Sequence, residues 1–491
     1  MLLAGGNAVD AAIATAATLT VVEPTMNGLG SDAFAIVWDG TKLHGLNASG
    51  RSPEAWTREA FERFETMPQE GWDTVTVPGA VSAWTVLSQR FGKLPFDQLL
   101  APAIGYAREG FTVSPIVSRA WAREVERYRD RAAFQAHFAP TRRAPAAGET
   151  FRSEPQAKTL EQIAATRGEA FYRGEIAQRI ATCAKNEGGL MTADDLAAHQ
   201  ADWVDPISVG YRGVTLHEMP PNGQGITALI ALNLLGHTQV ADLPVDSADA
   251  LHLHIEAMKL AFADVHAQVT DLAHMRVTPR DLLDPAYAQE RAKLIDPHRA
   301  QLAAPGISKA GDTVYLTAAD SSGMMVSFIQ SNCLGVGSGV VIPDTGISMQ
   351  NRGGFFSLDR GHPNEVGPRK RPFHTIIPAF VTRAGRPLMS LGVMGGGMQP
   401  QGHVQMITRM FDHAQNPQAA SDAPRWRVMG GMQVLLEHGT APDVAENLKS
   451  RGHDVAIADF GQFGGAQLIY RLDDGYVAGS DQRKDGQAVG F

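Results

Sequence analysis

The chain has 491 residues, of which 44% are apolar and 19% charged, and its 52 acidic residues outnumber 43 basic ones. These proportions fit a large folded protein. No dense Lys/Arg cluster is present, which excludes a positively charged surface for binding nucleic acid. Two cysteines, Cys183 and Cys333, are too few for a disulfide framework or a cysteine-built zinc site. No run of 18 apolar residues occurs, so we expect no membrane-spanning helix.

The first predicted element is a buried helix over Ala8–Val22, because its residues are apolar nearly all round. A helical pattern that begins so soon after Met1 favours a start that was once internal to a longer protein. No basic segment followed by an apolar one is present, as a secretory signal would require, and the expected location is therefore cytoplasmic.

A strand hairpin follows, with strands over Ala33–Trp38 and Lys42–Leu46 around the turn Asp39-Gly40. A hairpin directly after a buried helix favours a sheet covered by helices over a repeated strand–helix–strand unit. From Gly79 to Val240 the apolar spacing is mostly helical. The helices predicted from there on cover Ala80–Phe91, Phe96–Glu109, Ser118–Arg129, Glu154–Thr166, Glu175–Glu187, Ile226–Leu235 and Ser247–Val269.

Near residue 311 the pattern changes to short alternating runs separated by Gly/Asp turns, which predict strands. A helix-rich half followed by a strand-rich half, without a linker between them, predicts one layered α+β core. The predicted strands are Val314–Ala319, Met324–Gln330, Gly339–Ile342, Thr375–Thr382, Gln467–Arg471 and Tyr476–Gly479, with helices at Gln399–Ala414 and Ala441–Arg451.

Several catalytic motifs are absent from the sequence. There is no phosphate-binding Gly-x4-Gly-Lys-Ser/Thr loop, no His-Glu-x-x-His zinc motif and no Gly-x-Ser-x-Gly nucleophile turn. The histidines of the long helix, His252, His254 and His266, have no cysteine or paired acid at ligand spacing. We therefore expect ordinary core or surface histidines there, and no metal site.

Two glycine-rich segments remain, Asn332–Gly339 and Gly392–Gly397. Consecutive glycines let backbone N–H groups converge on one point, where they bind an anion or stabilise an oxyanion. A tight turn between strands is the alternative, and a glycine cluster alone favours that alternative.

Thr313 opens the strand-rich half. A threonine hydroxyl is a poor nucleophile unless a base lies beside it. If the chain is cut between Asp312 and Thr313, the new α-amine, with a pKa of about 8 in model peptides, becomes that base within the same residue. The pattern alone favours an ordinary threonine at the start of a strand.

Motifs spread along the chain change that balance, because in sequence order they resemble the γ-glutamyltransferase family of N-terminal-nucleophile hydrolases. The matching stretches are Gly5–Ala12, Val22–Pro24, Gly28–Gly30, Val77–Gly79, Leu94-Pro95, Leu100–Ala103, Ala170–Gly174, Pro220–Gly225, Gly395-Gly396 and Ala423–Arg425.

The resemblance implies a four-layer αββα sandwich and a precursor that cuts itself between Asp312 and Thr313. Residues 1–312 would form the large subunit and residues 313–491 the small one, together one heterodimeric fold. No metal or organic cofactor is implied, and the partner is a small-molecule amide.

The family's catalytic roles fall on four residues here. Thr313 is the expected nucleophile, Gly395 and Gly396 the glycine pair that stabilises the oxyanion, and Ser331 the hydroxyl that supports the nucleophile. Asn332, the next residue, is expected to face the substrate. The reaction implied is attack on a γ-glutamyl-type amide, with the acyl group passed to water or to an amine.

The expected donor pocket departs from the family. Ser49 stands where members have an arginine for the donor's α-carboxylate, and Arg51 is the nearest substitute. Arg352 replaces a glutamine and Phe355 the aspartate that holds the α-ammonium, while His374-Thr375 replaces a Ser-Ser pair. The gained Arg352 would repel the α-ammonium of a γ-glutamyl donor, and Phe355 has no negative charge to attract it. The alternative is therefore an amidohydrolase for an anionic acyl group without an α-amine, as in oxamate, glutaryl or cephalosporin side chains.

Other interpretations are weaker. A degenerate binding protein would not need Thr313, Ser331 and the glycine pair together. A capsule-anchoring transpeptidase of the same superfamily would need export. Cys333 lacks a nearby histidine in the sequence, and we expect it to be packed rather than nucleophilic.

Overall fold

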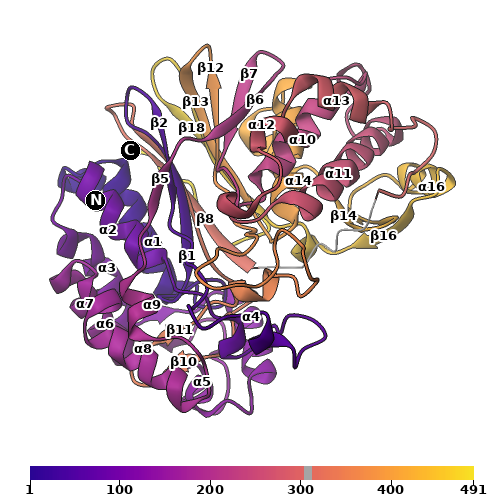
Figure 1. Ribbon diagram of the computed structural model, residues 1–491. Coiled ribbons are helices and arrows are strands. Elements are labelled where there is room, and N and C mark those ends of the chain that lie inside the picture. Colours follow the sequence, from indigo (N-terminus) through magenta and orange to yellow (C-terminus); the bar gives the residue numbers. More distant parts are fainter. Residues whose placement is uncertain (304–311) are drawn as a thin grey trace. The chain divides into compact units, whose positions relative to one another are not determined.

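The computed structural model describes residues 1–303 and 312–491, and Asp312 by its backbone only. The chain divides into two compact units (Figure 1). The first unit contains residues 1–204 and the segment that ends at His374, and the second contains the rest. Each unit therefore takes residues from both sides of the Asp312–Thr313 bond, so neither coincides with a proposed subunit.

The first unit is built on a five-stranded antiparallel sheet. Its inner strands β1 and β9 are buried along their whole length, although β9 carries several polar residues. In spatial order the strands are β5 (Asp202–Val204), β2 (Leu43–Asn47), β1 (Asp32–Trp38), β9 (Met325–Cys333) and β8 (Asp312–Ala319).

Helices cover this sheet, with α1 packed on β8 and β9 and α2 on β1 (Figure 1). The buried helix α1 begins at a capping box, in which Asn7 and Asp10 each accept a hydrogen bond from the other's backbone N–H. Two short two-stranded sheets complete the unit, β3 (Phe111–Thr112) with β4 (Thr150–Phe151) and β10 (Val341–Ile342) with β11 (Ile347–Ser348). The helices are α1 (Ala8–Val22), α2 (Ala80–Phe91), α3 (Phe96–Glu109), α4 (Pro115–Arg127), α5 (Ala132–Phe138), α6 (Glu154–Thr166), α7 (Glu169–Arg173), α8 (Glu175–Asn186) and α9 (Ala193–Ala197).

The second unit contains a six-stranded antiparallel sheet, with α10 packed on β6 and β7 and α14 on β13. The order is β18 (Tyr476–Ser480), β17 (Gly465–Arg471), β13 (Arg386–Met394), β12 (Ala379–Arg383), β7 (Val214–Glu218) and β6 (Ile207–Tyr211). A three-stranded sheet joins β14 (Trp426–Gly430), β15 (Gln433–Glu437) and β16 (Asp454–Ala458). The helices are α10 (Gly225–Leu235), α11 (Ala248–Gln268), α12 (Pro279–Leu282), α13 (Pro285–Ala292), α14 (Met398–Phe411), α15 (Pro417–Asp422) and α16 (Pro442–Ser450).

The sequence predicted the long helices and the first hairpin at nearly these bounds, but it missed several strands. Strands β5, β6 and β7 fall in a stretch predicted to be mostly helical. The period-two burial of β7, with Val214, Leu216 and Glu218 inside, is a strand signal that was overlooked. Strand β13 was not predicted at all, and β12 begins at Ala379 rather than at Thr375.

Among the described residues, no helix combines the length and apolarity needed to cross a membrane.

Candidate active site

Thr313 lies at an irregularity between strands β8 and β9. The register steps from the pair Asp312–Cys333 to the pair Val314–Gln330, so that two β9 residues, Ser331 and Asn332, oppose Thr313 alone. Such a bulge bends the strand and re-aims side chains. The Thr313 hydroxyl here donates to Ser331 Oγ at 3.2 Å, and both residues are buried.

Ser331 is held from a second side. Its Oγ accepts the backbone N–H of Cys333 at 2.8 Å, and Cys333 itself has a φ of 87°. A non-glycine residue in the left-handed region is uncommon and concentrates at functional sites. The hydroxyl pair expected from the sequence is therefore formed and fixed, whereas the Cys333 side chain is packed, at 1% exposure.

Asp32 lies across the same sheet from Thr313. In the antiparallel register of β1 and β9, Asp32 is directly opposite Ser331. Directly paired residues project to the same face of a sheet. Because Ser331 also bonds to Thr313, the side chains of all three residues lie on one face where three adjacent strands meet.

The Asp32 carboxylate is fully buried and connects loops that are distant in sequence. One oxygen accepts the N–H of Gly50 at 3.2 Å, and the other lies 3.1 Å from Nε2 of His374. The His374 ring is buried and packs edge-on against Phe34, with centroids 4.9 Å apart. His374, a residue of the expected donor pocket, is thus linked to the sheet end that carries Thr313.

Arg352 is completely buried in the short 3-10 helix Arg352–Phe355. The segment before it runs beside the same sheet end, since Gln350 donates its N–H to Gly30 O and Asn351 to Asn332 O. Burial lowers the pKa of the Arg352 guanidinium, although Cys333 and Asp32 act in the opposite sense.

Burial and nearby charges also shift the pKa values of Asp32 and His374. Burial raises the pKa of Asp32 to about 7, against the opposing pull of Arg352, the Gly50 N–H and Arg371. The pKa of His374 lies well below its usual value, because burial and the positive charges of Arg352 and Arg371 all disfavour the imidazolium form. His374 is therefore neutral near pH 7.

The Asn332 side chain is used within the protein. Its Oδ1 accepts the hydroxyl of Ser31 at 2.9 Å, and its Nδ2 donates to Ser348 Oγ at 2.9 Å and to Val336 O at 3.2 Å. These bonds fix the end of β9 to the loop before β1, to the loop that follows β9 and to β11. The amide holds the backbone around Ser331 in place.

Arg51 lies at a more open position. Its Nη2 is 3.6 Å from Asp202 Oδ2, with 39% of its side chain exposed. The buried Arg371 contacts the same carboxylate at 2.5 Å and also donates from Nε to Ser49 O at 2.8 Å. Arg371, which sequence reasoning did not single out, thus lies beside the backbone of Ser49.

The second unit holds the glycine pair between a strand and a helix. Strand β13 ends at Met394, Gly395 and Gly396 follow with φ of 123° and 60°, and α14 begins at Met398. A residue with a Cβ would be strained at either glycine. Among the described residues, none accepts a hydrogen bond from the N–H of Gly395 or Gly396. Two N–H groups at a helix N-terminus suit a developing negative charge.

Gln224 fixes this glycine turn. Its Nε2 donates to Gly396 O at 2.8 Å and to Thr375 O at 2.6 Å, and the side chain is 1% exposed. Within the second unit, the Pro220–Gly225 motif therefore brings Thr375 close to the glycine pair. Gln224 had been noted only as part of a motif, without a role.

One buried group among the described residues has ligand atoms close enough for a metal ion, His252, Glu256 and His453. Glu256 follows His252 by four residues on α11, so the expectation that the histidines of this helix have no acid at ligand spacing is wrong. The Lys259 ammonium already bonds to Glu256 at 2.8 Å and to His453 Nδ1 at 3.3 Å. His453 Nε2 is 2.8 Å from His252 Nδ1, and His252 Nε2 is 2.7 Å from the Asp296 carbonyl. The Lys259 ammonium thus supplies the positive charge, and the hydrogen bonds form a continuous chain from Glu256 to the Asp296 carbonyl.

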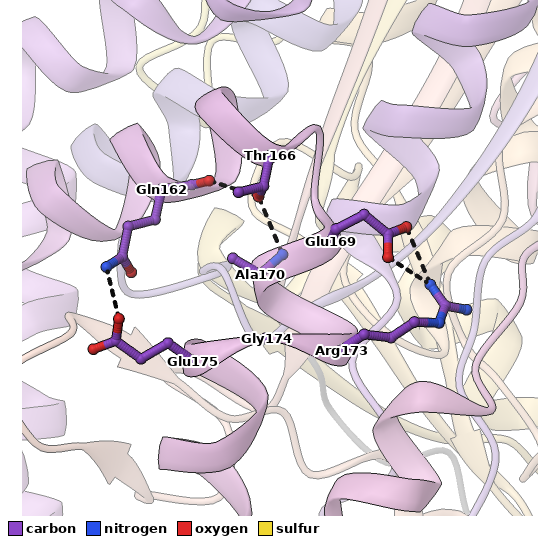
Figure 2. A pocket seen from close by; sticks show the side chains of 7 residues that line it. All are labelled: Gln162, Thr166, Glu169, Ala170, Arg173, Gly174 and Glu175. Carbon is purple, nitrogen blue, oxygen red and sulfur yellow. Dashed lines mark hydrogen bonds and ion pairs between the residues drawn. The ribbon is translucent and has the colours of Figure 1, made fainter.

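Figure 2 shows a surface hollow of about 410 Å³ between α6, α7 and α8. Its charged side chains pair with neighbours, Arg173 with Glu169 at 3.2 Å and Glu175 with Gln162 at 3.5 Å. The matching motif Ala170–Gly174 lies here, and its Tyr172 hydroxyl points inward to Pro78 O at 2.9 Å. The motif therefore has a packing role, and the hollow offers no unpaired charge to a ligand.

The sequence model described as Gamma-glutamyltranspeptidase matches residues 1–491, the whole chain. The chain belongs to the γ-glutamyltranspeptidase family. The expected enzyme class, an N-terminal-nucleophile hydrolase, and its mixed helix-and-sheet fold are thereby confirmed.

Individual relatives within the family have different names. The chain is 38% identical to the glutathione hydrolase-like YwrD proenzyme of Bacillus subtilis, covering 99% of this chain and 94% of the relative. It is 37% identical to the oxamate amidohydrolase proenzyme of Klebsiella pneumoniae, covering 100% and 95%. The crystal structure of cephalosporin acylase from Bacillus halodurans superposes with a TM-score of 0.95 at 48% identity, covering 99% and 92%.

The sequence predicted Thr313 and Ser331, which are hydrogen-bonded here, but it did not single out Asp32, Gln224 or Arg371, which lie close to other expected residues of their own units. A signal for Asp32 was present, because an acid that opens an otherwise apolar strand must find buried partners. The signals for the other two were weaker, since a glutamine or an arginine in a loop is most often exposed.

Ser331 gives a first testable prediction. Replacing Ser331 with alanine removes the hydrogen-bond acceptor of the Thr313 hydroxyl and leaves the Cys333 N–H without its partner. Losing a positioned group of this kind lowers kcat by roughly 10- to 100-fold, whereas Ser331→Thr keeps the hydroxyl and most of the rate. Steady-state kinetics of the two variants measures this, and equal rates for Ser331→Ala and the unaltered protein would contradict it.

Proposed function

We propose that the chain is a self-processing amidohydrolase with Thr313 as its nucleophile. In the precursor, the Thr313 hydroxyl attacks the carbonyl carbon of Asp312, the C–N bond breaks, and an ester forms. Water then hydrolyses the ester and leaves a carboxylate on Asp312 and a free amine on Thr313. Residues 1–312 and 313–491 stay together as a heterodimer. The buried Thr313–Ser331 pair supports this step, as does the proenzyme naming of both curated relatives.

The mature enzyme repeats this chemistry on a substrate. The Thr313 amine takes the hydroxyl proton as the oxygen attacks the amide carbon, and the same proton passes to the leaving amine. Water or an amine then releases the acyl group from the threonine ester. The family resemblance assigns the hydrogen-bond donors of the oxyanion to Gly395 and Gly396, and one such donor is worth roughly 10²–10³ in rate.

Of the two donor classes expected from the sequence, we favour the anionic acyl group that lacks an α-ammonium. The observation that carries this choice is the complete burial of Arg352, whose positive charge acts on both Asp32 and His374. A buried guanidinium is a strong partner for a carboxylate and repels an ammonium group. Phe355 stands where an acid would have to hold that ammonium. We place His374 with Arg352 in the acyl pocket, and Arg51 at its open side.

The names of two relatives support the same class, since oxamate carries a carboxylate and no α-amine, and the solved structure is named a cephalosporin acylase. A γ-glutamyl donor, which the family name implies, remains the competing substrate.

A panel of anilides tests the donor class. We expect kcat/KM for glutaryl p-nitroanilide to exceed that for γ-glutamyl p-nitroanilide by at least about tenfold, the cost of placing an unpaired ammonium in the pocket. Butyryl p-nitroanilide, which carries neither charge, serves as the control, and oxamate hydrolysis is followed by ammonia release. A preference for the γ-glutamyl compound would contradict the proposed donor class.

A further inference from the structure

Strands β12 and β13 stop pairing before β13 reaches the glycine pair. The last residues that they pair are Ala379 and Leu391, whereas β13 itself continues to Met394. If the antiparallel register continued, Ile377 and Val393 would lie opposite each other two positions further on. Both residues are buried, so their backbone N–H groups need other acceptors.

Two side chains of α14 provide those acceptors. The Ile377 N–H donates to Gln399 Oε1 at 2.9 Å, and the Val393 N–H donates to His403 Nε2 at 3.2 Å. The helix approaches β13 closely at Gly402, where a Cβ would lie 2.5 Å from the Val393 side chain. Side chains of α14 therefore take the place of a neighbouring strand at the end of β13.

Glu218, at the end of β7, sets which nitrogen of His403 carries the proton. His403 Nδ1 lies 2.6 Å from Glu218 Oε1, and both side chains are completely buried. Because Nε2 accepts the Val393 N–H, the ring proton is on Nδ1, which donates it to the carboxylate. The other tautomer, or an imidazolium, would instead point a second donor at the Val393 N–H.

This arrangement leaves the glycine pair available to a ligand. Val393 precedes Gly395 by two residues, and a strand beside it would continue the ladder and compete for the Gly395 N–H. His403 satisfies the Val393 N–H and ends the ladder there. From the other side, Gln224 holds the Gly396 carbonyl at 2.8 Å. Side chains thus fix the backbone on both sides of the glycine pair.

We propose that Glu218 and His403 are positioning residues for the oxyanion step, with Glu218 holding His403 in the tautomer that fixes β13 just before the glycine pair. The inference rests on the proposed function, because it needs Gly395 and Gly396 to bind the oxyanion. Both residues act through the backbone of β13, and the glycine N–H groups are needed most when the negative charge develops. Losing the pair should therefore lower kcat and leave KM almost unchanged.

Nuclear magnetic resonance of the unaltered protein, with nitrogen-15 in its histidines, tests the tautomer directly. Near neutral pH we expect a neutral His403 ring with its proton on Nδ1, assigned by the signals that disappear in His403→Gln. A proton on Nε2, or on both ring nitrogens, would overturn the inference. This measurement does not depend on whether any variant folds.

Two substitutions of Glu218 connect the tautomer to catalysis. Glu218→Leu removes the acceptor of the Nδ1 proton. We expect kcat for the best substrate of the anilide panel to fall roughly 10- to 100-fold, with KM changed by less than about twofold. Glu218→Gln keeps an oxygen acceptor and should recover most of kcat together with the Nδ1 tautomer.

His217→Gln is the matched control for these variants. His217 is the neighbouring residue of β7, and its Nε2 lies 2.9 Å from Thr382 Oγ1 on β12. Adjacent residues of a strand project to opposite faces of the sheet, so this variant changes the same strand without reaching His403. We expect an unchanged kcat.

The two proposals fail differently. If the protein hydrolyses none of the amides in the panel, the proposed function is wrong, and the role of Glu218 and His403 is overturned with it. If amides are hydrolysed and folded Glu218→Leu keeps kcat within about twofold of the unaltered enzyme, the proposed function stands and the inference is overturned. The Glu218–His403 pair would then serve packing alone.

Discussion

Replacing Thr313 with alanine will leave the purified protein as one uncut chain and lower amide hydrolysis by about 10⁴-fold or more, the loss typical of removing a covalent nucleophile. The alanine has no hydroxyl to attack the Asp312 carbonyl, so no α-amine is released to act as the base. Denaturing gel electrophoresis and p-nitroaniline release measure the two effects separately.

Two further threonine variants make this result specific. Thr313→Ser keeps a hydroxyl and should still cut itself, more slowly. Thr317 lies on the same strand and donates to Val326 O at 2.9 Å, so Thr317→Ala removes a threonine hydroxyl from β8 away from the bulge. That control should be processed and active. An uncut but fully active Thr313→Ala protein would rule out the N-terminal-nucleophile mechanism.

Replacing Arg352 with glutamine will lower kcat/KM for glutaryl p-nitroanilide by roughly 10- to 150-fold, because a hydrogen bond to a charged group contributes about 1.5–3 kcal/mol. The same change should alter the value for the uncharged butyryl p-nitroanilide by less than about threefold, since that substrate has no carboxylate to lose its partner. Steady-state kinetics with the two substrates gives the ratio.

The ratio of the two kcat/KM values distinguishes a loss of acyl-group recognition from a loss of folding. An unfolded or misprocessed protein loses both activities together, whereas a lost counter-ion affects only the anionic substrate. Arg352→Lys keeps the positive charge and should recover part of the preference. The exposed Arg360, which pairs with Glu62 at 3.3 Å on the surface of the same unit, provides the control Arg360→Gln. Equal losses on both substrates would show that Arg352 supports the structure and does not bind the carboxylate of the acyl group.

The parts of the site that could be predicted from sequence are local. Thr313 and Ser331 were expected from the family resemblance, and they are 18 residues apart on neighbouring strands of one hairpin, so their hydrogen bond joins positions that are close in the sequence. Helix α1 was also predictable, because a long apolar run after a capping residue has few other structures open to it.

The rest depends on contacts between distant segments. Asp32 and His374 are 342 positions apart, and Gln224 and Gly396 are 172 apart, so no local pattern connects them. Strands β6 and β7 were missed for a related reason, because they are short and lie among helices, where a mostly helical stretch obscured their period-two pattern. The bulge opposite Thr313 arises from a two-against-one register that neither strand shows by itself.

The intact mass of the purified, unaltered protein under denaturing conditions, with the N-terminal residue of each species determined, shows whether Thr313 carries a free amine. We expect two species, residues 1–312 and a second chain that begins with a free Thr313 amine. A single chain of 491 residues that nonetheless hydrolyses amides at full rate would contradict it, because Thr313 would then have no amine to act as the base.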